Sequence, residues 1–247
     1  MPKFFIDEEQ INNNILKIQN EDVNHIRNVL RMKIGDTLQV GVIPSGDNYK
    51  VEIIQINKDE IECKIMQKIE ETTESNVDIT IFQGIPKFEK MELIIQKNTE
   101  LGAKKIVPVA MERTVVKLNS KDMAKKLLRW NKISEVAAKQ SGRDIIPEVA
   151  SITKIDQIDV ANYDLVIVAY EQEKENKLKD EIQKLKNLNK EKYNLAIVIG
   201  PEGGISPEEI NILKEKNAKF VSLGKRILRT ETAGFVMTSN ILYDLEK

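Results

Sequence analysis

The feature that most constrains the fold is a change of rhythm along the chain. After residue 76, short apolar runs of strand length alternate with longer segments that have helical spacing. Strands that alternate with helices of this length predict a parallel sheet covered on both faces. The expected strands are 79–82, 106–110, 165–169, 195–199 and 220–223, and the expected helices are 87–101, 120–141, 176–189, 207–217 and 230–245.

The first part of the chain has another pattern, with β-branched runs separated by turn sequences. Its expected strands are 37–42, 49–56 and 60–66, and residues 21–32 have helical spacing through Val23, Ile26 and Leu30. The polar, non-periodic segment 70–76 is the expected linker. We therefore expect a small N-terminal β-barrel domain in residues 1–72 and an α/β domain in residues 73–247.

Composition excludes several classes of protein. With one Cys and one His, the chain cannot form an internal disulfide, a multi-cysteine metal site or a two-histidine metal motif, and we expect no metal. The longest apolar runs fall short of the roughly 18 residues of a membrane span, and the start MPKFFIDEEQ lacks the apolar core of a signal peptide. We expect a soluble, cytoplasmic protein.

The net charge of −1 conceals an uneven distribution, because residues 84–145 carry fourteen Lys+Arg and seven Asp+Glu. Lys90 and Lys97 are seven residues apart and share one face of the helix expected at 87–101. A basic stripe recurs along the helix expected at 120–141, at Lys121, Lys125, Arg129, Lys132 and Lys139. The stripe indicates either contact with a nucleic-acid backbone or an ordinary solvated face.

Residues 199–209 have the strongest chemical signature. Three glycines follow a buried-type strand, and Ser206, Pro207 and Glu209 form the N-cap, first turn and capping box of a helix. A phosphate loop would need a lysine after the glycines, but glutamates crowd this helix start. The pattern favours a loop for a neutral or cationic small molecule, and the alternative is a glycine-rich turn before a well-capped helix.

A second strand-to-helix junction lies at residues 223–233. Arg226 and Arg229 stand just before Thr230, which is the expected N-cap of the last helix. Arginines at such a junction can hold a phosphate or orient a base, and the alternative is a surface loop with two solvated arginines. In the front part, Arg27 and Arg31 are four residues apart on one helical face, with Lys33 just beyond.

These segments resemble a known family. VIGPEGGISPEE and LGKRILRTETA resemble the two cofactor-loop signatures of the SPOUT methyltransferases, specifically the 16S ribosomal RNA uracil-N3 methyltransferase family. The resemblance extends over nearly the whole chain, through HIRNVLRMKIGD, PKFEKMELIIQKNTELG and RWNKISEVAAKQSGRDIIPEV. The stretch Ser134–Ala137 departs slightly from the residues that the family favours there.

The resemblance implies a PUA-like RNA-binding β-barrel, then an α/β domain with a trefoil knot, a homodimer, and S-adenosylmethionine (SAM) as the cofactor. It implies that the cofactor-binding residues are Tyr170, Glu171, Ile199, Gly200, Pro201, Glu202, Gly203, Gly204, Leu223, Gly224, Ile227, Leu228, Arg229, Thr230, Thr232 and Ala233. Arg229 is the expected residue that orients the base, with Glu202 or Glu231 as proton acceptor. The expected RNA contacts are Arg27, Arg31, Lys33, Lys90, Lys97 and Arg143.

The expected function is SAM-dependent methylation of N3 of a uridine in 16S rRNA of the small ribosomal subunit. Three alternatives remain at this point. A related SPOUT enzyme would methylate tRNA or a ribose hydroxyl, and a non-catalytic protein would bind RNA without SAM. An enzyme acting on nucleotide phosphates is disfavoured by the acidic loop and by the missing lysine.

Overall fold

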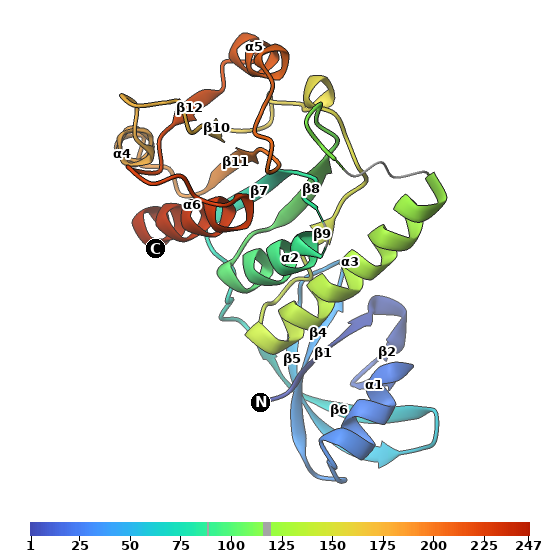
Figure 1. The fold of residues 1–247 in the computed structure, drawn as a ribbon. Helices are drawn as coiled ribbons and strands as arrows, with labels where there is room; N and C mark the ends of the chain where they lie inside the picture. Colours follow the sequence, from blue (N-terminus) through green and yellow to red (C-terminus); the bar gives the residue numbers. More distant parts are fainter. Residues whose placement is uncertain (88, 116–119) are drawn as a thin grey trace. The chain divides into compact units, whose positions relative to one another are not determined.

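The computed structural model describes residues 1–87, 89–115 and 120–247, and Phe88 and the side chains of Ser120 and Lys121 lie outside this description. The chain forms two compact units. Unit 1 comprises Met1–Glu74 and Ala138–Ile145, and unit 2 comprises Ser75–Ala137 and Ile146–Lys247 (Figure 1). Unit 1 therefore includes a short segment that the sequence analysis placed in the second domain.

Unit 1 is a curled six-stranded sheet with the order β1-β4-β5-β6-β3-β2 (Figure 1). Its strands are β1 (Lys3–Asp7), β2 (Ile11–Asn12), β3 (Ile15–Gln19), β4 (Thr37–Ile43), β5 (Asn48–Ile56) and β6 (Glu60–Ile69). Only β1 and β4 pair in parallel. Alternate residues such as Leu16 and Ile18 of β3 are buried, as the twofold period of a strand requires.

The helix predicted at residues 21–32 differs from the structure. A short α1 (Glu21–Asn24) continues as a π-helical turn, His25–Val29, and Arg31 has a positive φ of 53°. The wider turn carries the later residues off the helical face. Val23 and Ile26 are buried as predicted, but Leu30 is 38% exposed.

Unit 2 contains the predicted parallel sheet, with the order β12-β10-β11-β7-β8-β9. Its strands are β7 (Val77–Gly84), β8 (Lys105–Val109), β9 (Glu148–Val149), β10 (Leu165–Ala169), β11 (Tyr193–Ile199) and β12 (Lys219–Val221). Its helices are α2 (Lys90–Leu101), α3 (Ser120–Ser141), α4 (Leu178–Asn187), α5 (Pro207–Glu215) and α6 (Thr230–Leu245). The last four residues of α3 belong to unit 1.

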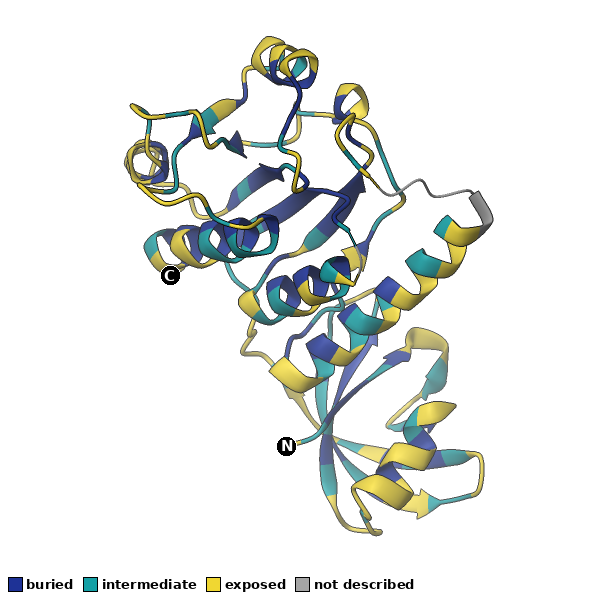
Figure 2. Cartoon of the chain, viewed as in Figure 1, coloured by how far each residue is buried: buried dark blue, intermediate teal, exposed yellow. Residues whose placement is uncertain are grey.

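Both faces of this sheet are buried (Figure 2). In β11, Ile197 packs into a core with residues of α2, α4 and α6, whereas its neighbour Val198 packs into a second core with residues of α5. Because alternate residues point to opposite faces, a strand covered on both sides is apolar throughout. Within the described ranges, no helix is both long and apolar enough to cross a membrane.

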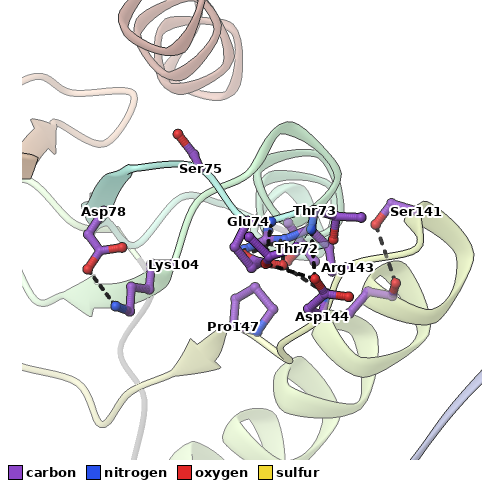
Figure 3. Close-up of polar contacts among 12 residues, drawn as sticks. Thr72, Thr73, Glu74, Ser75, Asp78, Lys104, Ser141, Arg143, Asp144 and Pro147 are labelled. Atoms are coloured by element: carbon purple, nitrogen blue, oxygen red, sulfur yellow. Dashed lines mark hydrogen bonds and ion pairs between the residues drawn. The ribbon is translucent and has the colours of Figure 1, made fainter. Parts of the chain in front are cut away.

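Charged side chains tie the predicted linker into unit 1 (Figure 3). The guanidinium of Arg143 donates to both oxygens of Glu74, and the backbone N–H of Asp144 also donates to Glu74. The buried carboxylate of Asp144 accepts from Lys3 and from the backbone N–H of Thr73. Segments 72–74 and 143–144 are thus held together by charge-assisted hydrogen bonds.

Candidate active site

A cavity of about 560 Å³ lies in unit 2 where three neighbouring strands end. It opens at the carboxyl ends of β10, β11 and β12, and is bounded by the segments 199–205 and 222–230 that follow two of these strands. In open α/β sheets this edge is where ligands bind.

The glycine segment 200–204 forms a tight turn in which the N–H of Gly204 donates to the carbonyl of Pro201 at 2.9 Å. Gly204 has a positive φ of 73°, and a Cβ there would lie 3.1 Å from Oε1 of Glu171. A Cβ on Gly203 would lie 3.0 Å from the side chain of Arg113. The glycines are therefore needed for the backbone conformation and for close packing.

The start of α5 confirms the predicted capping box. Ser206 is the N-cap and its hydroxyl accepts from the N–H of Glu209, while Pro207 occupies the first turn. The carboxylate of Glu209 accepts from the N–H groups of Ser206 and of Glu112. Glu209 is buried and does not line the cavity, so its charge serves the helix start.

The start of α6 differs from the prediction. Arg229 is the N-cap by backbone geometry, with φ −66° and ψ 154°, and Thr230 is the first helical residue. Instead of capping α6, the hydroxyl of Thr230 donates to the carbonyl of Gly200 at 2.7 Å. This contact fastens the second loop to the glycine segment, and both residues line the cavity.

Lys90 holds a cluster of charges at the cavity. Its Nζ lies 2.9 Å from Oε1 of Glu202 and 3.5 Å from Oε2 of Glu231. The hydrogen bond to Glu202 holds the pKa of Lys90 above its ordinary value. Burial raises the pKa of Glu202, but hydrogen bonds from Lys90 and from the N–H of Lys87 outweigh it, so this pKa lies below the ordinary value. Glu202 is thus a carboxylate at neutral pH.

The structure brings most of the predicted site residues together. All of the residues predicted to bind the cofactor line the cavity except Thr232. Arg229 and Glu202 line the cavity as well. Glu231 does not line it, but its carboxylate is paired with Lys90, which does. Lys90, predicted as an RNA contact, lies in the cavity wall and is paired with Glu202 and Glu231.

The other predicted RNA contacts are dispersed. Arg27, Arg31 and Lys33 are exposed in unit 1, and Arg27 also donates to two carbonyls of the 57–58 turn. Lys97 of unit 2 is paired with Glu100 at 2.8 Å. Arg143 differs from the prediction because it is 5% exposed and its guanidinium binds Glu74. A buried, paired guanidinium is a structural tie and is not available to a phosphate.

Three residues at the site have no signal in the sequence patterns. Gln83 is a buried polar residue within the apolar strand β7, and its amide donates to Thr230. Arg113 donates to the carbonyl of Gly203 at 3.1 Å from the loop after β8. Lys225 lies in the cavity wall beside the predicted arginines. The first two could not be found from spacing, since their partners lie 147 and 90 residues away.

Comparison with known families places both parts of the chain. Residues 73–242 match the model of an RNA methyltransferase domain, and residues 18–66 match that of an RNA methyltransferase PUA domain. The curated ribosomal RNA small subunit methyltransferase E of Bacillus subtilis is 37% identical over 231 residues, which cover 93% of this chain and 90% of that protein.

Two solved structures share the fold along almost the entire chain. A methyltransferase from Legionella pneumophila in complex with SAM has a TM-score of 0.86 at 30% identity, covering 99% of this chain and 98% of that one. A ribosomal RNA small subunit methyltransferase E from Neisseria gonorrhoeae, bound to SAM, has a TM-score of 0.83 at 28% identity and covers 98% and 97%.

Proposed function

The chain belongs to the RNA methyltransferase family, and we propose that it transfers a methyl group from SAM to N3 of one uridine in 16S rRNA. The observation that carries this proposal is the cavity at the carboxyl ends of β10, β11 and β12, lined by the glycine segment and by the loop before α6. The relatives named as small subunit rRNA methyltransferases, and the solved relatives that contain SAM, support the same function.

The residues of the cavity fit SAM. The walls combine the apolar side chains of Ile199, Leu223 and Leu228 with the backbone of the glycine segment, which suits an adenosine and a thioether-like chain. Glu171 and Glu202 place carboxylates in the lining for a sulfonium, although Glu202 is paired with Lys90 and the lining also holds Lys225, Arg226 and Arg229. The glycine segment has no P-loop lysine for a polyphosphate. A Cβ on Gly203 would press on Arg113 and a Cβ on Gly204 on Glu171, so either substitution would require the neighbouring side chain to shift.

When bound, SAM supplies an electrophilic methyl group on a sulfonium. The chain has to hold N3 in line with the bond between the methyl group and the sulfur, and to accept the proton that N3 loses. Arg229, exposed at the cavity edge, orients the uracil and stabilises the negative charge that develops on it. Because N3 lies on the Watson–Crick edge, the base has to be unpaired when it enters.

Glu202 is the better of the two predicted proton acceptors because it lines the cavity, as a base that must reach its proton has to. Lys90 keeps Glu202 ionised and fixes its position by the ion pair. Glu231 is a second carboxylate paired with Lys90, and it helps to hold the lysine beside Glu202. Release of Lys90 towards an incoming phosphate would make Glu202 more basic.

Unit 1 supplies the contact to RNA away from the reacting base. Arg31 and Lys33 are exposed next to Val29 and Ile34, which are 63% and 65% exposed. Exposed cations suit the phosphates of an RNA backbone, and the guanidinium plane of Arg31 can also stack on an unstacked base. Unit 1 is the PUA-like RNA-binding part in this proposal.

The resemblance to SPOUT enzymes also implies a homodimer and a trefoil knot formed by the loops around the cavity. Exposed apolar side chains on α6 and α2, among them Tyr243 at 90% and Leu93 at 41%, support an interface with a second copy. Light scattering coupled to size exclusion gives the mass in solution. A monomer at micromolar concentration would rule out the dimer, and tracing the backbone through an experimental electron density map tests the knot.

Transfer of radiolabelled methyl groups from SAM tests the function. The purified protein is incubated with naked 16S rRNA, with small ribosomal subunits and with tRNA, and digested nucleosides are identified by mass spectrometry. We expect N3-methyluridine in 16S rRNA, either naked or within the subunit, and none in tRNA. A ribose-methylated nucleoside or a labelled tRNA would support a related enzyme, and RNA binding with no SAM binding in calorimetry would support a non-catalytic protein.

The role of Arg229 is tested by Arg229→Ala in the same assay. We expect kcat to fall by about 10²-fold, the typical loss when a group that stabilises developing charge is removed. Arg129→Ala is the control, since Arg129 is exposed on α3 and paired with Glu92. An unchanged rate in Arg229→Ala would remove Arg229 from the mechanism without affecting the assignment of the substrate.

A further inference from the structure

Gln83 near the end of β7 is a fully buried amide at the back of the cavity's loops. Its Nε2 donates to the carbonyl of Gly84 and to the hydroxyl of Thr230, both at 2.9 Å. Among the described residues its Oε1 has no hydrogen-bond partner. Neither the sequence patterns nor the proposed mechanism gives this residue a role.

The contacts determine how the amide is turned. A carbonyl can only accept a hydrogen bond, so the group of Gln83 that faces Gly84 has to be the NH₂. The second hydrogen of that NH₂ then points to Thr230, whose hydroxyl oxygen has to accept it. Burying Oε1 without a hydrogen-bond partner lowers the stability of the fold, and an apolar residue here would avoid this cost. The two hydrogen bonds donated by the amide nitrogen are therefore the feature that glutamine provides at this position.

This arrangement fixes the proton of Thr230. With its oxygen accepting from Gln83, the hydroxyl directs its single hydrogen to the carbonyl of Gly200 at 2.7 Å. Three segments far apart in the sequence are joined in this way, namely the end of β7, the glycine segment and the first turn of α6. Gly200 and Thr230 line the cavity, whereas Gln83 does not.

We propose that Gln83 is a positioning residue for the SAM loops: by orienting the hydroxyl of Thr230, it holds the Gly200 carbonyl in the position that SAM binding needs. This inference rests on the proposed function, because it assumes that SAM occupies this cavity. The Gln83–Thr230–Gly200 relay, as we call it, pre-organises the loops before the ligand arrives.

Calorimetry of SAM binding to Gln83→Met, Thr230→Val and the double variant tests the relay. Methionine and valine match the shapes but remove the amide donors and the hydroxyl. We expect each single variant to weaken SAM binding about tenfold, the effect of losing one hydrogen bond. Because Gln83 acts through Thr230, the double variant should bind SAM no more weakly than Thr230→Val alone.

Two further variants separate positioning from general stability. Thr238→Val removes another buried hydroxyl of α6, which donates to Asn98 at 2.9 Å and lies outside the cavity lining, so it should lower Tm without changing the Kd of SAM. Thr230→Ser retains the hydroxyl and should restore most of the affinity. In steady-state assays of Gln83→Met and Thr230→Val, the KM for SAM should rise while kcat at saturating SAM changes less than about twofold.

The outcomes distinguish the two proposals. If the wild-type protein binds no SAM, the proposed function fails. If the wild type binds SAM and Gln83→Met binds it with equal affinity, or if the two substitutions are additive, the relay is wrong and the function stands. Should Gln83→Met fail to fold, equal SAM affinities of Thr230→Val and the wild type would overturn the relay by themselves.

Discussion

Gly204 shows how a single residue determines the shape of the cavity. Its φ of 73° is strained for any residue with a side chain, and a Cβ would press on Oε1 of Glu171 at 3.1 Å. We expect Gly204→Ala to lose roughly 1–2 kcal/mol of stability and, because Glu171 or the loop has to shift, to bind SAM about tenfold more weakly. Thermal unfolding and calorimetry measure the two effects.

Gly46 provides the matched control, since it has a φ of 77° in a turn of unit 1, and a Cβ there would meet no atom within 4 Å. Gly46→Ala carries the same backbone strain without the steric contact at the cavity. It should lower stability to a similar degree and leave SAM affinity unchanged. Equal SAM affinity in Gly204→Ala and the wild type would contradict the role of Gly204.

The buried ion pair of Lys3 and Asp144 predicts a pH-dependent stability. Burial raises the pKa of Asp144, but hydrogen bonds from Lys3 and Thr73 outweigh it and hold that pKa below 3.8. Because the folded-state pKa is depressed, the stabilisation is fully present above about pH 3.8 and is lost as the pH falls through the folded-state pKa. Asp144→Asn leaves the charge of Lys3 buried and should cost about 3–5 kcal/mol at pH 7.

Urea unfolding followed by circular dichroism measures this cost at several pH values. The deficit of Asp144→Asn should shrink in acid, where the wild-type carboxylate becomes protonated. Asp244→Asn is the control, because Asp244 and its partner Lys186 are both more than a third exposed and an exposed pair contributes less than about 1 kcal/mol. A deficit in Asp144→Asn that does not change with pH would count against the ion pair as its source.

At the scale of an element, the start of α5 depends on its cap. Ser206 is 1% exposed and accepts from the N–H of Glu209, so Ser206→Ala leaves that buried N–H without its partner. We expect a loss of about 1 kcal/mol in urea unfolding. Ser239→Ala, at an exposed position of α6, should stay within about 0.5 kcal/mol of the wild type. If Ser206→Ala were as stable as the wild type, the capping box of α5 would not contribute to stability.

The contrast between the two helix starts explains what the sequence can reveal about local structure. Ser206, Pro207 and Glu209 interact within four residues, so their pattern is complete in the sequence and the cap was predicted correctly. Thr230 has the same chemical type as Ser206, but its hydroxyl binds Gly200 and Gln83, which lie 30 and 147 residues away. A long-range partner overrode the local preference, and spacing alone could not reveal it.

The same reasoning applies to whole strands and helices. The strands of unit 2 are apolar because both of their faces are buried, and this signal predicted five of them and the parallel sheet. The strands β1, β2 and β3 of unit 1 were not predicted: β2 has two residues, too few to show a period, and β1 and β3 have five residues each. The π-helical turn after α1 keeps the spacing of a helix in the sequence while changing which side chains are buried.

For the whole molecule, the positive charge of the middle segment is less available than its sum suggests. Along α3, Arg129 is paired with Glu92, Lys132 with Glu135 and Lys139 with Asp22. Because each of these cations has an acidic partner, the net positive charge that the stripe presents to a distant phosphate is small. The sequence located the excess charge correctly, but only the fold shows which cations have partners.

Exposed cations of unit 1 should therefore dominate the salt dependence of RNA binding. Each phosphate contact that is lost reduces the slope of log K against log salt by about 0.7–0.9. Arg31→Gln combined with Lys33→Gln should reduce the magnitude of this slope by about 1.4–1.8 and weaken binding to a 16S rRNA fragment at low salt. Fluorescence anisotropy between low and physiological salt measures it.

The control pair is Lys174→Gln with Lys179→Gln, because both lysines are exposed in unit 2 outside the cavity lining. It changes the net charge by the same amount, so a general electrostatic effect would lower both slopes equally. A contact at Arg31 and Lys33 lowers only the first. Calorimetry adds the complementary readout: the proposed SAM site lies within unit 2, so the Kd of SAM should be the same in both double variants. A slope that is equal for the two pairs would place the RNA elsewhere on the protein.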